Sequence, residues 1–362
     1  MLEGYFVAVS ESLWAPYKEV EGKVGNKLSI HGGKMPNWKK SKVAILGVGP
    51  QADLFRKEFY ALEWRFEDLK VVDLGNLVHA EKETDRQFAL SDVIAELLDA
   101  GLLILIIGNG PGYMYGHYKG YRETGEQIEI VKVSPNIDLE EGSPLRQVLV
   151  EKPGYLFNID FIGTQAYYVS NQTAAVLEKM YFENHRLGEV RDQIEETEPI
   201  LRSAHMMLFD LNTIRTADNP ASLLQSPNGL YAEEAAKLVR YAGISNKLTS
   251  AHFYGLDPAS DARESYVLLA QMAWYFLDGV ISRFNDHPTP NHKDFLIYRN
   301  RLQSTGHELI FYKSRKSNRW WMEIPHPYEK QSFFIGCSYR DYQSVNDDEM
   351  PDRWWRAYQR LM

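Results

Sequence analysis

The sequence predicts a three-layer α/β/α fold, in which a mainly parallel sheet of about eight strands lies between two layers of helices. Three observations predict it: short β-branched runs that end at Gly or Asn, nearly continuous apolar character within these runs, and helical patterns between them. Continuous apolar runs are typical of strands covered on both faces. Strands that alternate with helices pair in parallel, so the expected sheet is mainly parallel.

The expected elements follow one another in a regular order. The apolar runs that predict strands lie at 43–49, 69–75, 102–108, 128–134, 155–163, 205–212 and 247–256. The patterns that predict helices lie at 52–66, 91–100, 173–184, 231–242 and 264–284, and we expect Ser91 to cap the second of them. Ligands of such sheets bind beyond the carboxyl ends of the strands, so candidate site residues are sought there.

A change of composition after Phe284 predicts a second region. Residues 285–294 are polar and contain proline, and the runs at 307–314, 319–324 and 332–336 predict a small antiparallel sheet. Pro351 then predicts the start of a terminal helix. We expect a main α/β domain over residues 1–290 and an aromatic-rich extension over residues 291–362 that packs on it.

Composition argues against several classes of function. The net charge of −9 disfavours nucleic acid as a partner, because phosphate binding needs a basic face. Cys337 is the single cysteine, so no intramolecular disulfide can form. The first residues lack the pattern of a signal peptide, and no apolar run reaches the roughly 18 residues of a membrane span. A cytoplasmic protein is expected.

Two glycine-rich loops follow expected strands and raise the possibility of nucleotide binding. The loop Gly47–Ala52 has the spacing GxGxxA, and Asp73 stands where a ribose-binding acid would be. Pro50 and Pro111, however, remove backbone N–H donors that a phosphate would need. A tight turn between strand and helix is the simpler interpretation, and nucleotide binding is kept as a third hypothesis.

The strand ends, taken in order, resemble those of the arginase/agmatinase/formimidoylglutamase (ureohydrolase) family. The similar segments span residues 43 to about 284, and the IGTQ segment is closest to the formimidoylglutamase branch. In chain order they are 52–62, Asp73–Asn76, Gly108–Pro111, Ser134–Asp138, Ile162–Gln165, Asp210–Asn212, Pro227–Leu230 and Gly255–Asp261.

The resemblance implies an arginase-like fold and a site that, in the family, holds two Mn²⁺ ions on six side chains. The matching positions here are Pro111, Ser134, Asn136, Asp138, Asp210 and Asn212, of which only the two aspartates are anionic. We call these six the metal-site positions. Gly255 matches a substrate-facing Glu of several members.

Two carboxylates do not balance about four positive charges, so the expectation is that no catalytic residues, no metal and no cofactor remain. A single Mg²⁺ or Ca²⁺ on Asp138 and Asp210 is one alternative, and hydrogen bonds from neighbouring amides are the other. His117 could pair with either carboxylate as an acid or base, but a packing role is the simpler interpretation.

Aromatic residues gather in the expected extension and suggest an interface. Trp, Tyr and Arg dominate interface hot spots. The candidates are Trp320, Trp321, Trp354, Trp355 and Tyr358. The alternative is that these rings seal an edge of the sheet.

Two functional hypotheses result. The first is a non-catalytic ureohydrolase-like pseudoenzyme that serves as a scaffold, with a protein partner or self-association, no membrane span and an unknown small-molecule ligand. Self-association is also what the resemblance implies, because family members form trimers or hexamers. The alternative is an active hydrolase of linear amidines, similar to formimidoylglutamase or agmatinase, with two Mn²⁺ ions in an atypical or misaligned site, or with a different group in the same cleft.

Overall fold

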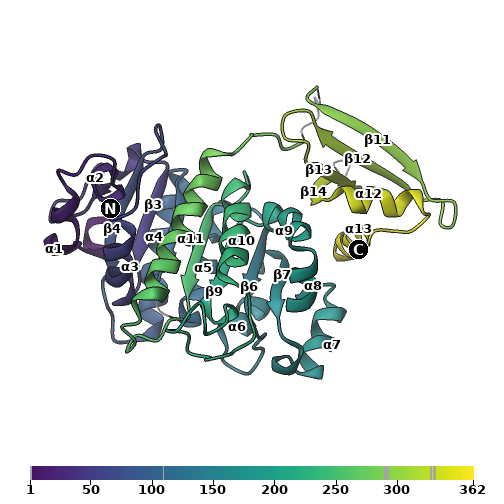
Figure 1. Ribbon diagram of the computed structural model, residues 1–362. Coiled ribbons are helices and arrows are strands. Elements are labelled where there is room, and N and C mark those ends of the chain that lie inside the picture. The colour runs from purple at the N-terminus through teal and green to yellow at the C-terminus, as the bar shows by residue number, and fades with distance from the viewer. Residues whose placement is uncertain (1, 109, 289–292, 327, 329–331) are drawn as a thin grey trace.

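The computed structural model describes residues 2–108, 110–288, 293–326, 328 and 332–362 (Figure 1). Its main sheet has ten strands in the order β1-β4-β3-β5-β10-β9-β6-β7-β8, with β2 beside β4. All pairings are parallel except that of β1 with β4. The strands are β1 Phe6–Val7, β2 Ser29–Ile30, β3 Val43–Gly47, β4 Val71–Leu77, β5 Leu103–Ile107, β6 Ile128–Val133, β7 Leu156–Thr164, β8 Asn184–Arg186, β9 Met206–Asp210 and β10 Ser250–Tyr254.

Helices cover both faces of this sheet, which confirms the predicted three-layer α/β/α class (Figure 1). On one face, side chains such as Ile45 and Leu105 pack against α3, α10 and α11. On the other face, alternate side chains such as Ile104 and Ile106 pack against α4, α5 and α6. The helices are α1 Glu11–Trp14, α2 Val24–Lys27, α3 Gln51–Phe59, α4 Glu83–Asp99, α5 Met114–Lys119, α6 Pro144–Val150, α7 Asn171–Lys179, α8 Leu187–Asp192, α9 Thr197–Ser203, α10 Ala232–Ile244 and α11 Arg263–Ile281.

Several helix boundaries differ from the sequence prediction, and α7 ends at Lys179 rather than at Asn184, where strand β8 begins. Helix α4 begins at Glu83, so Ser91 lies inside it and the predicted cap is wrong. The sequence analysis missed the first two turns because they are largely exposed and lack an apolar periodicity. Helix α3 ends at Phe59 rather than near Phe66. The carbonyl oxygens of Tyr60 and Leu62 accept hydrogen bonds from the backbone N–H groups of Gly25 and Val24, at 3.1 and 2.9 Å. Tertiary pairing therefore takes the place of further helical turns.

The C-terminal residues form a second, antiparallel sheet in the order β11-β12-β13-β14. The predicted runs become β12 Glu308–Ser314, β13 Trp320–Ile324 and β14 Phe333–Cys337, and β11 Phe295–Arg301 adds a strand that the sequence analysis missed. Helices α12 Tyr339–Asn346 and α13 Asp352–Leu361 follow, and Pro351 is the N-cap residue of α13. The predicted division at residues 290 and 291 lies outside the described residues and stays a prediction.

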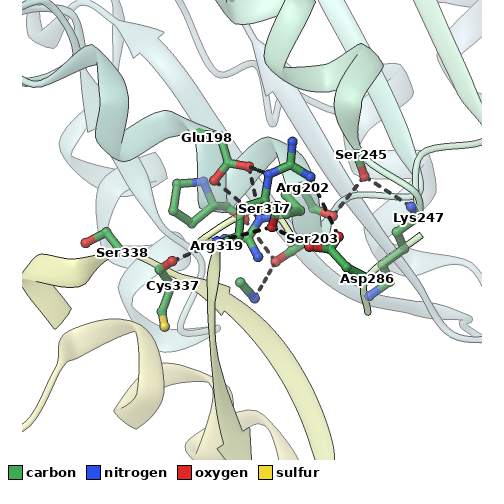
Figure 2. A network of polar contacts seen from close by, with 12 residues as sticks. Glu198, Arg202, Ser203, Ser245, Lys247, Asp286, Ser317, Arg319, Cys337 and Ser338 are labelled. Atoms are coloured by element: carbon green, nitrogen blue, oxygen red, sulfur yellow. Dashed lines mark hydrogen bonds and ion pairs between the residues drawn. The ribbon is translucent and has the colours of Figure 1, made fainter. Parts of the chain in front are cut away.

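The second sheet attaches to the main domain through helix α9 (Figure 2). Arg202 Nη2 donates to the Cys337 carbonyl oxygen at 3.1 Å, and its guanidinium lies 4.2 Å from the centre of the Trp321 ring. Glu198 pairs with Arg202 at 3.0 Å and with Arg319 of the extension at 3.3 Å. The extension is thus joined to α9 by buried, charged and aromatic contacts.

None of the described helices is long and apolar enough to cross a membrane.

Candidate functional site

The candidate site begins at the end of β6, where alternate side chains share one face of the sheet. Ser134 is fully buried, and its Oγ donates a hydrogen bond to the Asn136 carbonyl oxygen at 2.8 Å. Lys132 is 5% exposed, and its Nζ donates to Ser134 Oγ at 2.8 Å. Nζ also lies 3.4 Å from the Asn136 carbonyl oxygen. An ammonium group therefore lies beside two of the metal-site positions.

Asp210 and Asn212 come together at the end of β9. Asp210 Oδ1 accepts hydrogen bonds from the backbone N–H of Asn212 at 3.0 Å and from its Nδ2 at 2.7 Å. Asn212 Oδ1 accepts from Ser222 Oγ and from the Leu224 N–H, both at 2.9 Å. An amide side chain can donate to Asp210 through its nitrogen and accept from Ser222 through its oxygen, whereas an ionised carboxylate could only accept. Asn212 is therefore a hydrogen-bonding centre of this loop.

Charge connects these two strand ends. Burial raises the pKa of Asp210, and the nearby Lys132 ammonium and the Asn212 amides oppose this rise. Burial lowers the pKa of Lys132, and the charges of Asp210 and Asp138 oppose this fall. Each of the two buried groups thus favours the charged form of the other.

Gly255, after β10, completes the buried part of the site. Its φ is +100°, and a Cβ there would lie 2.3 Å from Asp210 Oδ1 and 2.8 Å from Asn212 Nδ2. A glutamate at this position, as in several family members, would collide with both. The position is therefore glycine because the carboxylate and amide fill the space beside it.

Asn136 and Asp138 lie on the exposed side of the site. Asp138 Oδ1 accepts a hydrogen bond from the Glu140 N–H at 2.9 Å, which fixes the loop after β6. Both residues line a cleft of about 940 Å³, together with Arg146 and Tyr168. The cleft thus reaches the loop after β6, whereas Lys132 and Asp210 are not among the residues that line it.

Pro111 and His117 are placed differently. Pro111 opens a short 3₁₀ helix, Pro111–Tyr113, and is exposed. His117 is fully buried, and its Nε2 lies 2.6 Å from Ser250 Oγ on β10. Burial lowers the pKa of His117 well below its ordinary value, so the ring is neutral. Its hydrogen-bond partner is Ser250 rather than Asp138 or Asp210, which is the packing role that the sequence favoured.

Asp73 is unavailable to a ribose. It is fully buried and accepts hydrogen bonds from Arg56 Nε and Nη2, both at 2.9 Å, and from the Tyr60 hydroxyl at 2.8 Å. Gly47 serves close packing, since a Cβ there would lie 2.0 Å from Asn76 Oδ1. The nucleotide hypothesis has no support from these contacts.

Most of the predicted interface residues are buried within the extension. Trp320, Trp321 and Trp354 are 7%, 3% and 1% exposed. Tyr358 stacks on Trp354 with ring centres 5.1 Å apart. Trp355 is 42% exposed and is the one tryptophan of the set whose indole reaches solvent. Three of these rings therefore lie in the core of the extension.

Lys132 is the site residue that the sequence analysis missed. A lysine inside a fully buried strand, whose other charged residue is Glu129, is unusual because burial of an ammonium group is costly unless it is paired. Its spacing of two from Ser134 placed both side chains on one face. That alternation was the available signal.

The donor set does not fit two Mn²⁺ ions. In the part of the chain that the structure describes, no group of three or more His, Cys, Asp or Glu side chains could hold a metal ion. The metal-site positions supply two carboxylates, and a buried ammonium lies among them. Such a set is far from balancing two dications, so no chemical step through them can be derived from it.

Comparisons with known proteins confirm the resemblance. The model of the Arginase family matches residues 48–278. A formimidoylglutamase of Lysinibacillus sphaericus is 33% identical over 135 residues, which cover 33% of this chain and 39% of that protein. Another, of Geobacillus kaustophilus, is 26% identical over 226 residues, 58% of this chain and 70% of that protein. The match to the first relative therefore spans less than two thirds of its length.

Solved structures give the same result for the fold. A formiminoglutamase of Trypanosoma cruzi, crystallised with Mn²⁺, superposes with a TM-score of 0.62 at 18% identity, covering 68% of this chain and 95% of that one. The Bacillus subtilis formimidoylglutamase gives 0.60 at 16% identity, covering 76% and 100%. The fold is arginase-like, with a small antiparallel sheet added at the C-terminus.

One expectation is overturned by these comparisons. The sequence analysis expected no cofactor, whereas the relatives are formimidoylglutamases and the solved Trypanosoma cruzi relative contains Mn²⁺. The expectation was based on metal ligands matched motif by motif, and it did not take account of the similarity over residues 48–278 as a whole.

Proposed function

Because the chain belongs to the arginase family, we propose that it is a hydrolase of linear amidines, of the formimidoylglutamase kind, acting at the ends of β6 and β9. The observation that carries the proposal is the convergence of Lys132, Ser134, Asp210 and Gly255 at one edge of the sheet. The loop that follows Ser134 lines an open cleft through Asn136 and Asp138. This reverses the order of the two hypotheses drawn from the sequence, since the relatives favour the hydrolase.

The chain's own residues suit a cationic, planar substrate. An amidinium group carries positive charge and N–H donors, and Asp138 and Asp210 supply the anionic acceptors. The cleft presents the exposed side chain of Arg146, which suits a carboxylate at the other end of the molecule. In the relatives Mn²⁺ would activate water. Here Asp138 and Asp210 are the carboxylates that could approach such an ion, although two do not fit a pair.

The test is release of formamide from N-formimidoyl-L-glutamate by the purified full chain, in buffer with Mn²⁺ and in buffer with a chelator. We expect release above the blank, and we expect Asp210→Asn to reduce it at least tenfold. The exposed Asp99→Asn serves as the control and should leave the rate unchanged. A rate equal to the blank in both buffers, for this substrate and for agmatine and arginine, would refute the proposal.

A non-catalytic scaffold is the second candidate, favoured by the neutral side chains at four of the six metal-site positions. Trp355 is the exposed indole through which it would associate. Sedimentation of the full chain would then show an oligomer that Trp355→Ala dissociates and that the exposed Tyr275→Ala leaves intact. A chain that stays monomeric at all concentrations would remove self-association from this candidate.

A further inference from the structure

The open cleft next to the loop after β6 extends between helices α6 and α7, which both contribute to its lining, and we call it the α6–α7 cleft. Asn136 joins it to the buried strand end, because its carbonyl oxygen accepts a hydrogen bond from Ser134 Oγ at 2.8 Å. The volume of about 940 Å³ is near the upper end of the range for small-molecule sites. A ligand that fills it is larger than a single formimidoyl amino acid.

The two helices run in the same direction along one face of the sheet. Helix α6 connects the parallel neighbours β6 and β7, and α7 connects β7 and β8. Each helix therefore begins at the carboxyl edge of the sheet and returns toward the amino edge. Leu145 of α6 and Leu177 of α7 are buried in the same core layer. The α6–α7 cleft thus leads away from the candidate site.

The lining is polar and negatively charged where the helices begin. The loop before α6 contributes the carboxylates of Asp138 and Glu140, and α6 contributes the guanidinium of Arg146. Ser170, the N-cap residue of α7, lies at the same end. With these side chains ionised, the carboxylates exceed the guanidinium by one charge, so this mouth of the cleft favours a cation.

The lining is apolar where the helices end. Leu149 and Val150 close α6, and Val176 and Met180 lie at the end of α7, where Met180 is the C-cap residue. Val150 is 63% exposed, and the other three side chains are half-buried. The helix rises about 10 Å from Thr173 to Met180, at about 1.5 Å per residue. An apolar chain of that length would remove these side chains from water, which is favourable.

We propose that the α6–α7 cleft binds an unbranched alkyl chain, and that the amidines this protein hydrolyses carry such a chain on a nitrogen of the formimidoyl group. The cationic head lies at the mouth, against Asp138 and Glu140, and the chain lies between the ends of the two helices. In the reaction, water adds to the formimidoyl carbon, the bond to the alkyl-bearing nitrogen breaks, and formamide and a protonated alkylamine leave. The reaction rests on the proposed hydrolase function, whereas the binding of the chain does not.

Binding is measured by calorimetric titration of the purified full chain with N-butylformamidine, N-octylformamidine and the uncharged N-octylformamide. A fully buried methylene strengthens binding about fourfold, so partial burial predicts that the octyl amidine binds at least about tenfold more tightly than the butyl amidine. The uncharged N-octylformamide should bind about threefold more weakly than the octyl amidine, and Asp138→Asn should remove that difference. Equal affinities for the butyl and octyl amidines, including undetectable binding of both, would overturn the inference and leave the cleft to another occupant.

Variants of the lining assign the alkyl chain to the cleft. Val150→Asn and Val176→Asn should each reduce the advantage of the octyl over the butyl amidine at least about threefold. Val78→Asn is the matched control, because Val78 is 43% exposed and lies outside the cleft, and it should keep the full advantage. Circular dichroism establishes that each variant is folded. An advantage that persists in both cleft variants, or that is also lost in Val78→Asn, would overturn the inference.

Failure of the proposed function would give a different result. A chain that binds the octyl amidine in this way but releases no formamide from it would refute hydrolysis and leave the alkyl site in place. A chain that releases formamide equally well from the butyl and octyl amidines, with equal affinities, would support hydrolysis and refute the alkyl site.

Discussion

Two buried aspartates of the main sheet, Asp73 and Asp210, are paired in different ways. Asp73 receives both arms of the Arg56 guanidinium, the Tyr60 hydroxyl and the Gly75 N–H, at 2.8–2.9 Å. Asp210 receives two amide donors of Asn212, and its opposite charge, Lys132, is bound to Ser134. A carboxylate that is fully paired with its counter-ion serves the fold, whereas one paired mostly with neutral amides keeps charge available for a ligand.

The largest effect is expected at Asp73. Asp73→Asn leaves the fully buried Arg56 guanidinium without its main counter-ion, which should reduce the free energy of unfolding by about 3–5 kcal/mol in urea denaturation followed by circular dichroism. The control is Asp53→Asn, because Asp53 also pairs with Arg56 at 2.9 Å but its side chain is 43% exposed. That change should cost less than about 1 kcal/mol. Similar losses in both would show that Asp73 is not the main counter-ion.

The second largest loss of stability is expected at Gly255, which lies against Asp210. Gly255→Ala combines a left-handed backbone with a collision against Asp210 Oδ1, and should lower the free energy of unfolding by about 2–4 kcal/mol. Gly33→Ala is the matched control, because its φ is +125° and no atom lies within 4 Å of its Cβ. It should cost only the backbone strain, about 1–2 kcal/mol. Equal losses in the two variants would show that the space beside Asp210 can accommodate a methyl group.

Asp160, on β7, is a third buried carboxylate. The effect expected from its substitution lies between those at Asp73 and Asp210. Burial and the neighbouring charge of Glu183 raise its pKa to about 6, whereas its ordinary value is 3.8. The folded state therefore binds the proton more tightly than the unfolded chain, and the charged form costs stability above pH 6. Asp160→Asn should raise the free energy of unfolding at pH 7.5 by about 1–3 kcal/mol.

The gain in the free energy of unfolding from Asp160→Asn should shrink as the pH falls through 6. It should vanish below about 4, where Asp160 is protonated in both the folded and the unfolded chain. Urea denaturation at pH 7.5, 6 and 4 measures it, with the exposed Asp99→Asn as the control. A gain that does not depend on pH would assign the effect to packing instead of charge.

The smallest effect is expected at Asp210 itself. Asp210→Asn keeps an acceptor for the Asn212 amides and removes a charge whose pKa burial has raised, so the free energy of unfolding should change by less than about 1 kcal/mol. Denaturation in urea beside Asp73→Asn makes the comparison direct. A loss as large as that at Asp73 would mean that Asp210 is a structural counter-ion and not a site carboxylate.

The sequence alone determined the order of elements and the fold class. Apolar runs such as 102–108 and 128–134 can be strands only if both faces are covered, and periodic helices between them force parallel pairing. It also placed Ser134, Asp210 and Gly255 at strand ends, because those residues follow the runs directly. Local patterns carry this information because each element depends on its own residues.

Tertiary structure decided which side chains meet. Only the pairing of β6 with β9 brings Lys132 near Asp210, although the two are far apart in the chain. The collision that requires Gly255, and the amide of Asn212 that joins Asp210 to Ser222, likewise depend on contacts between separate segments. The burial of Trp354 beneath the second sheet has the same origin. These contacts join residues that are far apart in the sequence, so the sequence patterns could not predict them.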